Sequence, residues 1–353
     1  MRSASARRRS LFTTLCVPLL ACTALVTLDP APPPASAASG VDIRVGSFNI
    51  QSVSLDGSRG QQRPWKQRRG KIIRQIMGER VAVMGLQEAN PSKHFRHRLV
   101  SGSNQYLDLK NGLNRAGGHF AVANRYAYNC VKSSTPYKCR HKDRNASNGD
   151  RILYNTRKLR LLGVNAMKYH RQSSTTGLYL AWARFRSRAN GHTFLFATTH
   201  LDPRNRSTRK AQWRQMIRKI NHVKHGRPVI AVGDFNTQKF DKMAKSMLPA
   251  MKRAGYGDVL NQRYRVNPSR HVRARKRVHG WMNTANHLNR NVASWAYEKA
   301  HRKTGNSIDY IFASNRLKVP AYKVVVDFNP RTMRVNGVMP SDHNMIRATI
   351  RLP

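Results

Sequence analysis

Short apolar runs that end in polar residues recur along the chain. Runs of this length, bounded by polar or turn-forming residues, are typical of strands buried on both faces of a sheet. Four of them lie at Ile43–Phe48, Val81–Leu86, Thr193–Thr199 and Val229–Gly233. The polar residues that follow these runs are Asn49, Gln87 with Glu88, His200 and Asp234. The pattern predicts buried strands that end in side chains able to bind a metal or a phosphate.

Helical periodicity separates these strands. Apolar residues three or four apart occur at Ile72, Ile73 and Ile76 within Trp65–Glu79, and similar spacing recurs within Thr208–Val223. Such spacing places the apolar residues on one face of a helix. Further strands are expected at Asn148–Leu162, Leu178–Arg186, Ser307–Phe312 and Met345–Leu352. Strands alternating with helices predict an α/β fold.

The stretch Pro228–Thr237, PVIAVGDFNT, carries the clearest chemical signal. Gly233 permits a turn at the end of the buried run, and the ligands of α/β sheets bind beyond such carboxyl ends. If the strand continues, Asp234 and Asn236 point the same way and offer an anionic acceptor and a neutral donor to one target. A phosphoester with a divalent metal suits both groups. The alternative is that the two residues only cap the turn.

Acidic residues and histidines occur together again near the C-terminus. Asp309 lies among the apolar residues of a predicted strand, and Asp342 stands beside His343. An acid and a histidine in one site can divide metal binding and proton transfer between them. The chain has 16 acidic residues against 65 lysines and arginines, yet Glu88, Asp234, Asp309 and Asp342 all lie within or beside predicted strands. Scarce acids in these places indicate a common function.

The net charge of +49 implies a polyanionic partner or substrate, with a generally basic proteome as the alternative explanation. Basic runs with interspersed aromatic residues lie at Arg63–Lys71, Arg140–Arg144, Arg204–Arg214 and Arg263–Arg277. Such surfaces suit the phosphate backbone of a nucleic acid. With 353 residues and 40% apolar content, the chain can also bury a large core.

Residues 1–40 have the pattern of a signal peptide followed by a Pro-rich spacer, so residues 41–353 form the predicted catalytic domain. Several arginines precede an apolar stretch, Leu11–Leu28, and a small-residue cleavage site follows near Ala37. Pro18 and threonines interrupt the apolar stretch, which argues against a stable membrane span. We expect a secreted, extracellular protein. A twin-arginine signal and a lipoprotein anchored through Cys22 are the alternatives.

Two cysteines, Cys130 and Cys139, remain outside the leader. In an exported protein we expect a disulfide between them, and a pair of free thiols is the alternative. A zinc site is not expected, because His141 alone does not complete a set of four ligands.

Seven short segments follow one another between Asn49 and His343. In chain order they are SFN, LQE, GDRILY, TTH, GDFN, SIDYIF and SDH. Together they resemble the motifs of the endonuclease/exonuclease/phosphatase superfamily, the deoxyribonuclease I-like proteins, over essentially all of residues 41–353. The resemblance implies an α/β (α+β) fold built as a four-layer αββα sandwich, in which two mixed β-sheets pack together and helices cover them. It also implies metal-assisted hydrolysis of phosphoesters at the strand ends.

The resemblance implies a metal site. Glu88 matches the principal Mg²⁺ ligand of the family, and Asn49 and Asp342 are expected close to it. Oxygen ligands of this kind are those that Mg²⁺ prefers, with Mn²⁺ or Ca²⁺ as alternatives.

Catalytic roles follow from the same resemblance. Asp234 and Asn236 would orient the attacking water and the scissile phosphate. Two histidine–acid pairs, one activating water and one serving the leaving oxygen, match His343 with Asp309 and His200 with Asp150. Deoxyribonuclease I itself uses an arginine and a tyrosine in the minor groove, and the corresponding positions here are Asn90 and Asn148, which puts groove reading by that route in doubt.

These features together predict a secreted, Mg²⁺-dependent phosphodiesterase that acts as a monomer. A nuclease that cuts DNA, or RNA, with little sequence specificity is the first expectation. One alternative is a phosphoesterase of the same fold that acts on a lipid headgroup or a phosphorylated small molecule, as sphingomyelinases and inositol phosphatases do. The other is a non-catalytic protein that binds polyanions.

Overall fold

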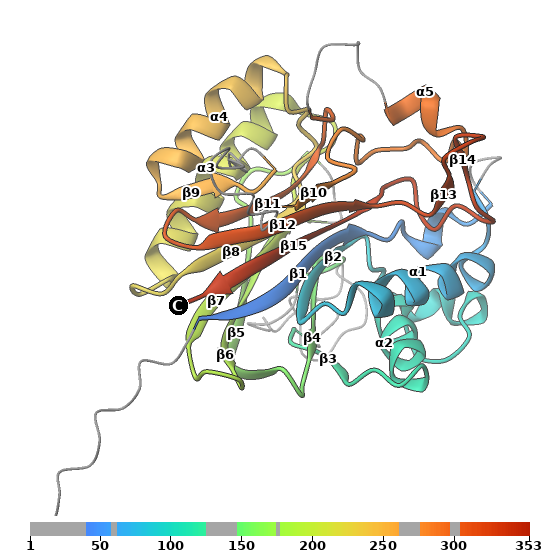
Figure 1. The fold of residues 1–353 in the computed structure, drawn as a ribbon, viewed down its shortest axis with the longest axis horizontal. Helices are drawn as coiled ribbons and strands as arrows, with labels where there is room; N and C mark the ends of the chain where they lie inside the picture. Colours follow the sequence, from blue (N-terminus) through green and yellow to red (C-terminus); the bar gives the residue numbers. More distant parts are fainter. Residues whose placement is uncertain (1–39, 58–61, 125–146, 174–176, 261–275, 297–303) are drawn as a thin grey trace, which may run out of the picture. The chain divides into compact units, whose positions relative to one another are not determined.

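Two β-sheets pack face to face within the compact unit Ser39–Pro353 (Figure 1). The computed structural model describes residues 40–57, 62–124, 147–173, 177–260, 276–296 and 304–353. In the first sheet, β1 runs parallel to β2 and antiparallel to β15. The spatial order of its seven strands is β10 (Lys276–Val278), β12 (Lys318–Val325), β15 (Met345–Leu352), β1 (Val41–Asn49), β2 (Val83–Gln87), β4 (Arg151–Asn155) and β3 (Phe120–Val122).

The second large sheet has six strands, of which β7 and β8 run parallel. Their spatial order is β5 (Leu159–Lys168), β6 (Tyr179–Ser187), β7 (Thr193–His200), β8 (Val229–Asp234), β11 (Asp309–Ser314) and β9 (Tyr256–Asp258). A small two-stranded sheet consists of β13 (Phe328–Asn329) and β14 (Arg334–Val335).

Helices cover the outer face of each large sheet (Figure 1). Helices α1 (Trp65–Glu79) and α2 (Gln105–Arg115) pack on the seven-stranded sheet, whereas α3 (Arg206–Val223) and α4 (Lys242–Arg253) pack on the six-stranded sheet. Three shorter helical segments are Val53–Leu55, Lys93–Arg98 and α5 (Val292–Ala296). The structure therefore confirms the expected four-layer αββα sandwich.

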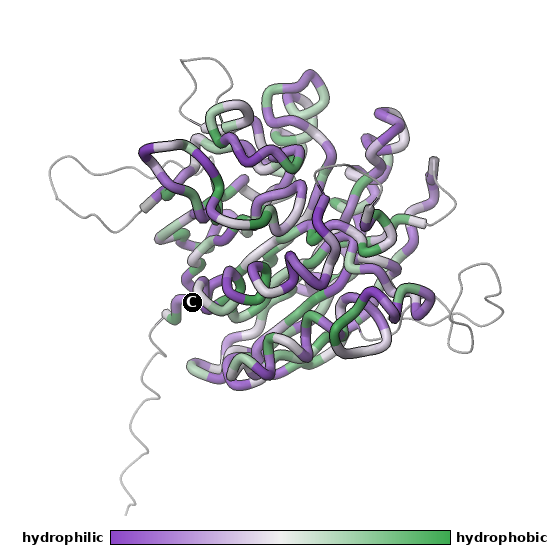
Figure 2. The backbone as a smooth tube through the Cα atoms, turned by 90° about the vertical axis from the view of Figure 1, so that its right-hand side faces the viewer, coloured by the Kyte–Doolittle hydropathy of each residue, from purple (hydrophilic) through white to green (hydrophobic). Residues whose placement is uncertain are grey.

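Three hydrophobic clusters hold the four layers together, and hydrophobic segments of the chain gather along the strands (Figure 2). The central cluster fills the space between the two sheets, with Phe185, Phe194 and Phe196 fully buried in it. The sheets approach closely at Gly85, because a Cβ atom at this position would lie 2.3 Å from Oγ1 of Thr198. Close packing of the sheets fixes the strand ends of one sheet against those of the other.

Several predicted elements agree with the structure, and two differ. Helix α1 and strand β15 have the predicted bounds. The predicted strand Asn148–Leu162 is instead two strands, because the chain turns between β4 and β5. Strand β8 ends at Asp234 and does not continue to Asn236, which has a positive φ of 47°.

Other expectations concern parts of the chain that the structure does not describe. The predicted signal peptide, the Cys130–Cys139 disulfide and the basic run Arg140–Arg144 lie outside the described residues. Among the helices that are described, none has both the length and the apolar character needed to span a membrane.

A buried ion-pair cluster joins helix α1 to the seven-stranded sheet. Glu79, the last residue of α1, accepts hydrogen bonds from Nζ of Lys323 at 2.5 Å and from Nε of Arg347 at 2.9 Å. Burial disfavours ionisation of Glu79, but the bonds from Lys323 and Arg347 outweigh it and lower the pKa of this carboxyl below its ordinary 4.5. The cluster therefore stabilises the folded state only while Glu79 is ionised.

We expect Glu79→Gln to lower the free energy of unfolding by about 1–3 kcal/mol at neutral pH, because both cations lose a charged partner. Since the folded-state pKa is depressed, this contribution is present above about pH 4.5 and is lost as the pH falls through the folded-state value. Urea unfolding from pH 7 to pH 3 measures the effect. Asp42→Asn, which breaks the exposed pair with Arg351, is the matched control, and an equally large effect in both variants would contradict the prediction.

Candidate active site

The carboxylate of Asp234 lies at the centre of the predicted site residues. Its Oδ2 is 3.2 Å from Nδ2 of Asn49, 3.5 Å from Nε2 of His200 and 3.6 Å from Nε2 of His343. Its Oδ1 accepts the backbone N–H of Asn236 at 2.9 Å. The Asp234 side chain is only 1% exposed, so this contact network is largely screened from water.

Strand pairing explains why these residues meet. In the six-stranded sheet, His200 on β7 pairs with Asp234 on β8, and Asp234 pairs with Asp309 on β11. Residues in register on adjacent strands project on the same side of a sheet, so the three side chains form one row. Gly233 precedes this row with a φ of 154°, and a Cβ atom there would lie 2.1 Å from the carbonyl oxygen of Thr199. Only glycine fits this position.

His343 and Asp309 form the predicted histidine–acid pair. Nδ1 of His343 lies 2.9 Å from Oδ2 of Asp309, and both side chains are buried. Burial alone would disfavour the charged imidazole, but the carboxylates of Asp309 and Asp234 outweigh burial and raise the pKa of His343 well above its ordinary value. The two carboxylates therefore favour the protonated form of His343, whose Nε2 faces Asp234.

Glu88 extends the network toward the surface. Its Oε1 accepts a hydrogen bond from Nδ2 of Asn49 at 3.0 Å, and its Oε2 accepts the backbone N–H of Ser52 at 3.1 Å. Glu88 has a φ of 55°, in the left-handed region that disfavours residues with a side chain. Three further residues beside the site, Gln51, Asn148 and Asn236, also have positive φ values. Such conformations cluster at functional sites, where the surrounding structure holds them in place.

The donor set suits a divalent cation. Asp234, Asp309 and His343 each place one ligand atom within 4.8 Å of the others, a spacing that suits a metal ion. Glu88 and Asp342 are the carboxylates for which the sequence predicts metal binding. Oxygen-rich sites of this kind bind Mg²⁺ or similar ions. Asn49 donates its amide N–H groups to Glu88 and Asp234, while its Oδ1 accepts the N–H of Gln51. It thus joins the two carboxylates, and its role as a metal ligand stays a prediction.

The predicted pairing of His200 with Asp150 takes a different form. The carboxyl of Asp150 lies beside the backbone of His200, whereas the imidazole Nε2 of His200 faces Asp234. Asp150 is buried, and burial raises the pKa of its carboxyl well above the ordinary value despite the neighbouring guanidinium of Arg151. Asp150 is therefore suited to fixing the backbone at His200 rather than to orienting the imidazole.

Asn236 also differs from its predicted orientation. Because β8 ends at Asp234, the Asn236 side chain turns away and donates from Nδ2 to the carbonyl oxygen of Leu201 at 2.9 Å. This bond fixes the segment directly after His200. Asp202 accepts the backbone N–H groups of Arg204 and Asn205 and so caps the turn that follows His200.

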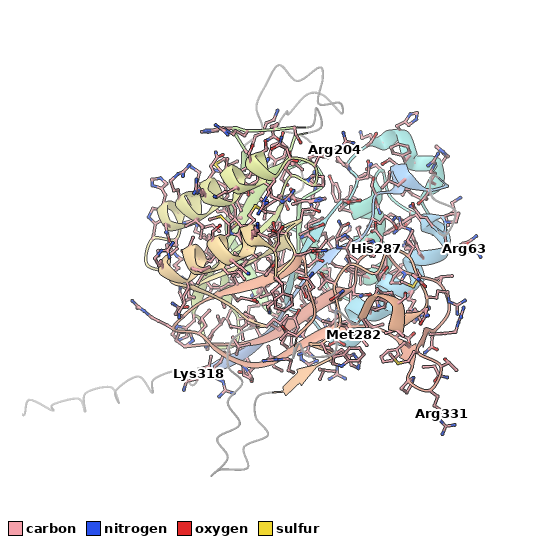
Figure 3. All side chains as sticks on the ribbon, turned by 90° about the horizontal axis from the view of Figure 1, so that it is seen from above. Arg63, Arg204, Met282, His287, Lys318 and Arg331 are labelled. Atoms are coloured by element: carbon pink, nitrogen blue, oxygen red, sulfur yellow. The ribbon has the colours of Figure 1, made fainter. Side chains whose placement is uncertain are left out.

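A pocket of about 440 Å³ opens beside the network. Glu88, His200 and Asp150 line it together with Asn90 and Asn148, the two positions at which the chain departs from the resembled family. Arg204, labelled in Figure 3, also lines the pocket. The pocket gives a substrate access to Glu88 and His200, while His343 and Asp309 stay behind them in the protein.

Arg68 supports the site from helix α1 and was not identified from the sequence. Its Nη1 donates to the carbonyl oxygens of Ile50, at 2.5 Å, and Pro340, at 3.1 Å, and its Nη2 donates to Gln51 at 2.7 Å. It thereby joins the segments that follow Asn49 and precede Asp342. The spacing in the sequence could have indicated that Arg68 is buried. Arg68 is four residues before Ile72 and so lies on the same buried face of α1.

Comparison with known proteins agrees with this geometry. The model of the Endonuclease/Exonuclease/phosphatase family matches residues 46–343. Over 222 residues the chain is 28% identical to Nocturnin of Drosophila melanogaster, a match that covers 59% of this chain. It spans only 31% of the length of that curated relative.

Solved structures show the same fold at low sequence identity. A mannosyl-6-phosphatase of Bacteroides thetaiotaomicron is 18% identical with a TM-score of 0.60 and covers 87% of this chain and 99% of its own. The human Nocturnin catalytic domain with bound sulfate anion is 19% identical with a TM-score of 0.52, covering 88% and 94%. TDP2 of D. rerio with a single strand DNA product is 16% identical with a TM-score of 0.55, covering 88% and 98%.

We expect Arg68→Met to lower the free energy of unfolding by about 3–5 kcal/mol, because it removes a buried cation and leaves its acceptors without a donor. Arg68→Lys should lose less, since it keeps the charge but can serve fewer carbonyl groups. Chemical denaturation measures both. Lys66→Met, at an exposed position of the same helix, is the control, and an unchanged midpoint for Arg68→Met would contradict the role of Arg68 in joining the two segments.

Proposed function

The chain belongs to the endonuclease/exonuclease/phosphatase family, and on that premise we propose that it is a secreted, Mg²⁺-dependent nuclease acting on DNA or RNA with little sequence specificity. Hydrolases of this family are phosphoesterases. The observation that carries the proposal is the contact of one buried carboxylate, that of Asp234, with Asn49, His200 and His343. A non-catalytic protein would not need a buried carboxylate between two imidazoles.

The basic charge supports a nucleic-acid substrate. With 65 lysines and arginines against 16 acids, the chain attracts polyanions of any sequence. Nitrogen-bearing side chains project all around the described part of the chain, Arg63 and Arg331 among them (Figure 3). Phosphate contacts of this kind position a strand without reading its bases, which agrees with little sequence specificity.

The metal site of this proposal consists of Glu88 and Asp342, with Asn49 beside them. A Mg²⁺ ion bound there would stabilise the negative charge that develops on the phosphate oxygens. Mn²⁺ or Ca²⁺ could bind to the same oxygen atoms, and Ca²⁺ accepts a wider range of coordination geometries than Mg²⁺.

The chain's own residues supply orientation and proton transfer. Asp234 accepts a hydrogen bond from the attacking water and turns it toward the phosphorus. His343, held as a cation by Asp309, stabilises the charged transition state or returns a proton to the leaving oxygen. His200 is 14% exposed on the pocket side and contacts the substrate directly.

The expectations for the rest of the chain form part of the same proposal. Residues 1–40 act as an export signal and spacer, residues 41–353 form the catalytic domain, and Cys130 and Cys139 pair in the oxidising environment outside the cell. The enzyme acts as a monomer. The lipoprotein alternative, with anchoring through Cys22, predicts the same chemistry at a membrane surface.

A phosphomonoester is the second candidate substrate. The structural likeness to a mannosyl-6-phosphatase and the size of the pocket beside Glu88 both favour testing it. A pocket of about 440 Å³ holds a phosphorylated small molecule. The net charge favours neither a free sugar phosphate nor a neutral lipid headgroup over nucleic acid, so the nuclease stays the first proposal.

We expect the mature protein with Mg²⁺ to nick closed circular DNA and to degrade linear DNA or RNA, and EDTA to abolish this activity. His200→Ala and His343→Ala should each lower the rate about 10²–10⁴-fold, because each removes a proton-transferring or charge-stabilising group. His222→Ala, an exposed histidine on α3, is the matched control and should keep full activity. Gel assays and a phosphomonoester assay with mannose 6-phosphate compare the substrates. Binding of DNA and RNA without cleavage would contradict the nuclease proposal.

We expect Mg²⁺ to raise the free energy of unfolding by about 2.7 kcal/mol when its concentration is a hundredfold above the dissociation constant. Glu88→Gln should remove most of this stabilisation, because an amide is a weaker ligand than a carboxylate. Thermal unfolding with Mg²⁺ and with EDTA measures the difference. Asp327→Asn alters an exposed carboxylate and serves as the control. An unchanged response of the Glu88→Gln variant to Mg²⁺ would contradict the assignment of Glu88 as a metal ligand.

A further inference from the structure

A second pocket, of about 450 Å³, lies at the opposite end of the same strands. It is lined by the first residues of β1 and by the turns that lead into β2, β5 and β7. The active-site residues Asn49, Glu88 and His200 stand at the other ends of β1, β2 and β7. At about 3.3 Å per residue along β1, this pocket is roughly 15–25 Å from Asn49. Lys318, whose strand neighbour Arg351 pairs with Asp42, marks this end of the molecule in Figure 3, and Arg204 marks the other.

Five cations surround this pocket, which we call the distal basic pocket. They are Arg44, Arg80, Arg157, Lys158 and Arg188. The one acidic residue in its lining, Asp42, is bound to Arg351 through two hydrogen bonds of 2.7 and 3.1 Å. The charge of the five cations therefore converges on the pocket without a matching number of carboxylates.

Within the described residues, the hydrogen bonds of these cations bring no carboxylate to them. Arg44 donates to the carbonyl oxygen of Glu79, Lys158 to that of Arg80, and Arg188 to that of Thr156. Carbonyl groups orient the side chains but carry no net charge. Burial and, to a smaller extent, the neighbouring charges of Arg44 and Arg80 lower the pKa of Lys158, as expected for like charges held close together. A bound anion would relieve this repulsion.

Apolar residues also line the distal basic pocket. They are Val41, Ile43 and Ala82. A flat solvated surface, which this very basic chain has in many places, would not combine a cavity of about 450 Å³ and apolar residues with five cations. A nucleic-acid strand matches this combination, since its phosphates can meet the cations while a base or sugar contacts the apolar residues.

We propose that the distal basic pocket binds phosphate groups of a nucleic-acid strand, as a second contact outside the active site. The choice of a nucleic-acid strand as the ligand rests on the proposed function. The pocket holds the strand without cutting it, because the carboxylates and histidines of the network around Asp234 lie at the other end of the sandwich. It would raise affinity for long strands over short ones by adding a second point of attachment.

The test measures binding of a fluorescent oligonucleotide of about 12 nucleotides by anisotropy in EDTA, where cleavage does not interfere. The double variant Arg157→Glu/Lys158→Glu reverses two exposed charges of the pocket. The control Lys252→Glu/Arg253→Glu makes the same change at two exposed neighbours on α4, outside the pocket. We expect the pocket variant to bind at least about tenfold more weakly than the control. Its slope of log affinity against log salt should fall by about 1.4, for two contacts at about 0.7 each.

Two further measurements keep the outcomes distinct. Hydrolysis of bis(p-nitrophenyl) phosphate, too small to reach both pockets, should be unchanged in the pocket variant and shows that it is folded. Equal loss of oligonucleotide binding in the pocket variant and its control would overturn the proposal, since only net charge would then matter. Inorganic phosphate and a mononucleotide are tested as separate ligands. If either binds as tightly as the oligonucleotide, the proposal that the pocket binds a strand is also overturned.

The proposed function and the distal basic pocket can fail separately. Wild-type protein that binds strands through Arg157 and Lys158 but does not cleave them with Mg²⁺ would retain the pocket and exclude the nuclease. Protein that cleaves DNA or RNA normally, with the pocket variant no weaker than its control, would retain the nuclease and exclude the pocket.

Discussion

The candidate active site depends on one buried carboxylate. Asp234 contacts both histidines and Asn49 through a single oxygen, and its other oxygen fixes the backbone of Asn236. A carboxylate this deeply buried is stable only with hydrogen-bond donors or cations around it. The surrounding donors are therefore as much a requirement of folding as of chemistry. They also come from strands of both sheets, so the site forms only when the sandwich is complete.

The fold meets this requirement through register and close packing. The parallel pairing of β7 with β8 and the antiparallel pairing of β8 with β11 place His200, Asp234 and Asp309 in one row. Gly85 lets the two sheets approach until Asn49, from the other sheet, reaches Asp234. Arg68 then joins the segments after Asn49 and before Asp342 from behind. Each of these residues is important because of where the folded chain places it. The residues next to it in the sequence do not predict that place.

The sequence predicted the parts of the fold whose signals are local. Helix α1 has a regular apolar face, and β15 is bounded by polar segments, so both were predicted with correct bounds. Helix α2 was not predicted, because its buried face includes the polar Gln105 and Asp108, whose partners come from other segments. Helix α4 was also not predicted, and it contains Pro249. The turn between β4 and β5 was missed because both strands read as one extended run.

The same distinction holds within the site. The motifs identified residues that lie together in the structure. The contact between His343 and Asp309 is the one that the motifs predicted. They did not identify that the His200 imidazole faces Asp234, or that Asn236 turns toward Leu201, because both depend on where β8 ends and on strand register. Strand β8 ends at Asp234, whose Oδ1 accepts the backbone N–H of Asn236, and Asn236 has a positive φ. The sequence allowed this turn as the alternative to a continued strand and did not decide between the two.

Charge links the site to the rest of the molecule. A chain with a net charge of +49 attracts a polyanion to its whole surface, whereas carboxylates at the site repel the phosphate that must react. Burial reduces this repulsion at Asp150, whose raised pKa favours the neutral form, and His343 offsets it at Asp309. Glu88 and Asp342 are less buried than Asp234 and Asp309, and Glu88 lines the pocket. A divalent cation bound at the two carboxylates, as we propose, would make this end of the site attractive to phosphate, so the proposed metal and the basic surface would act together.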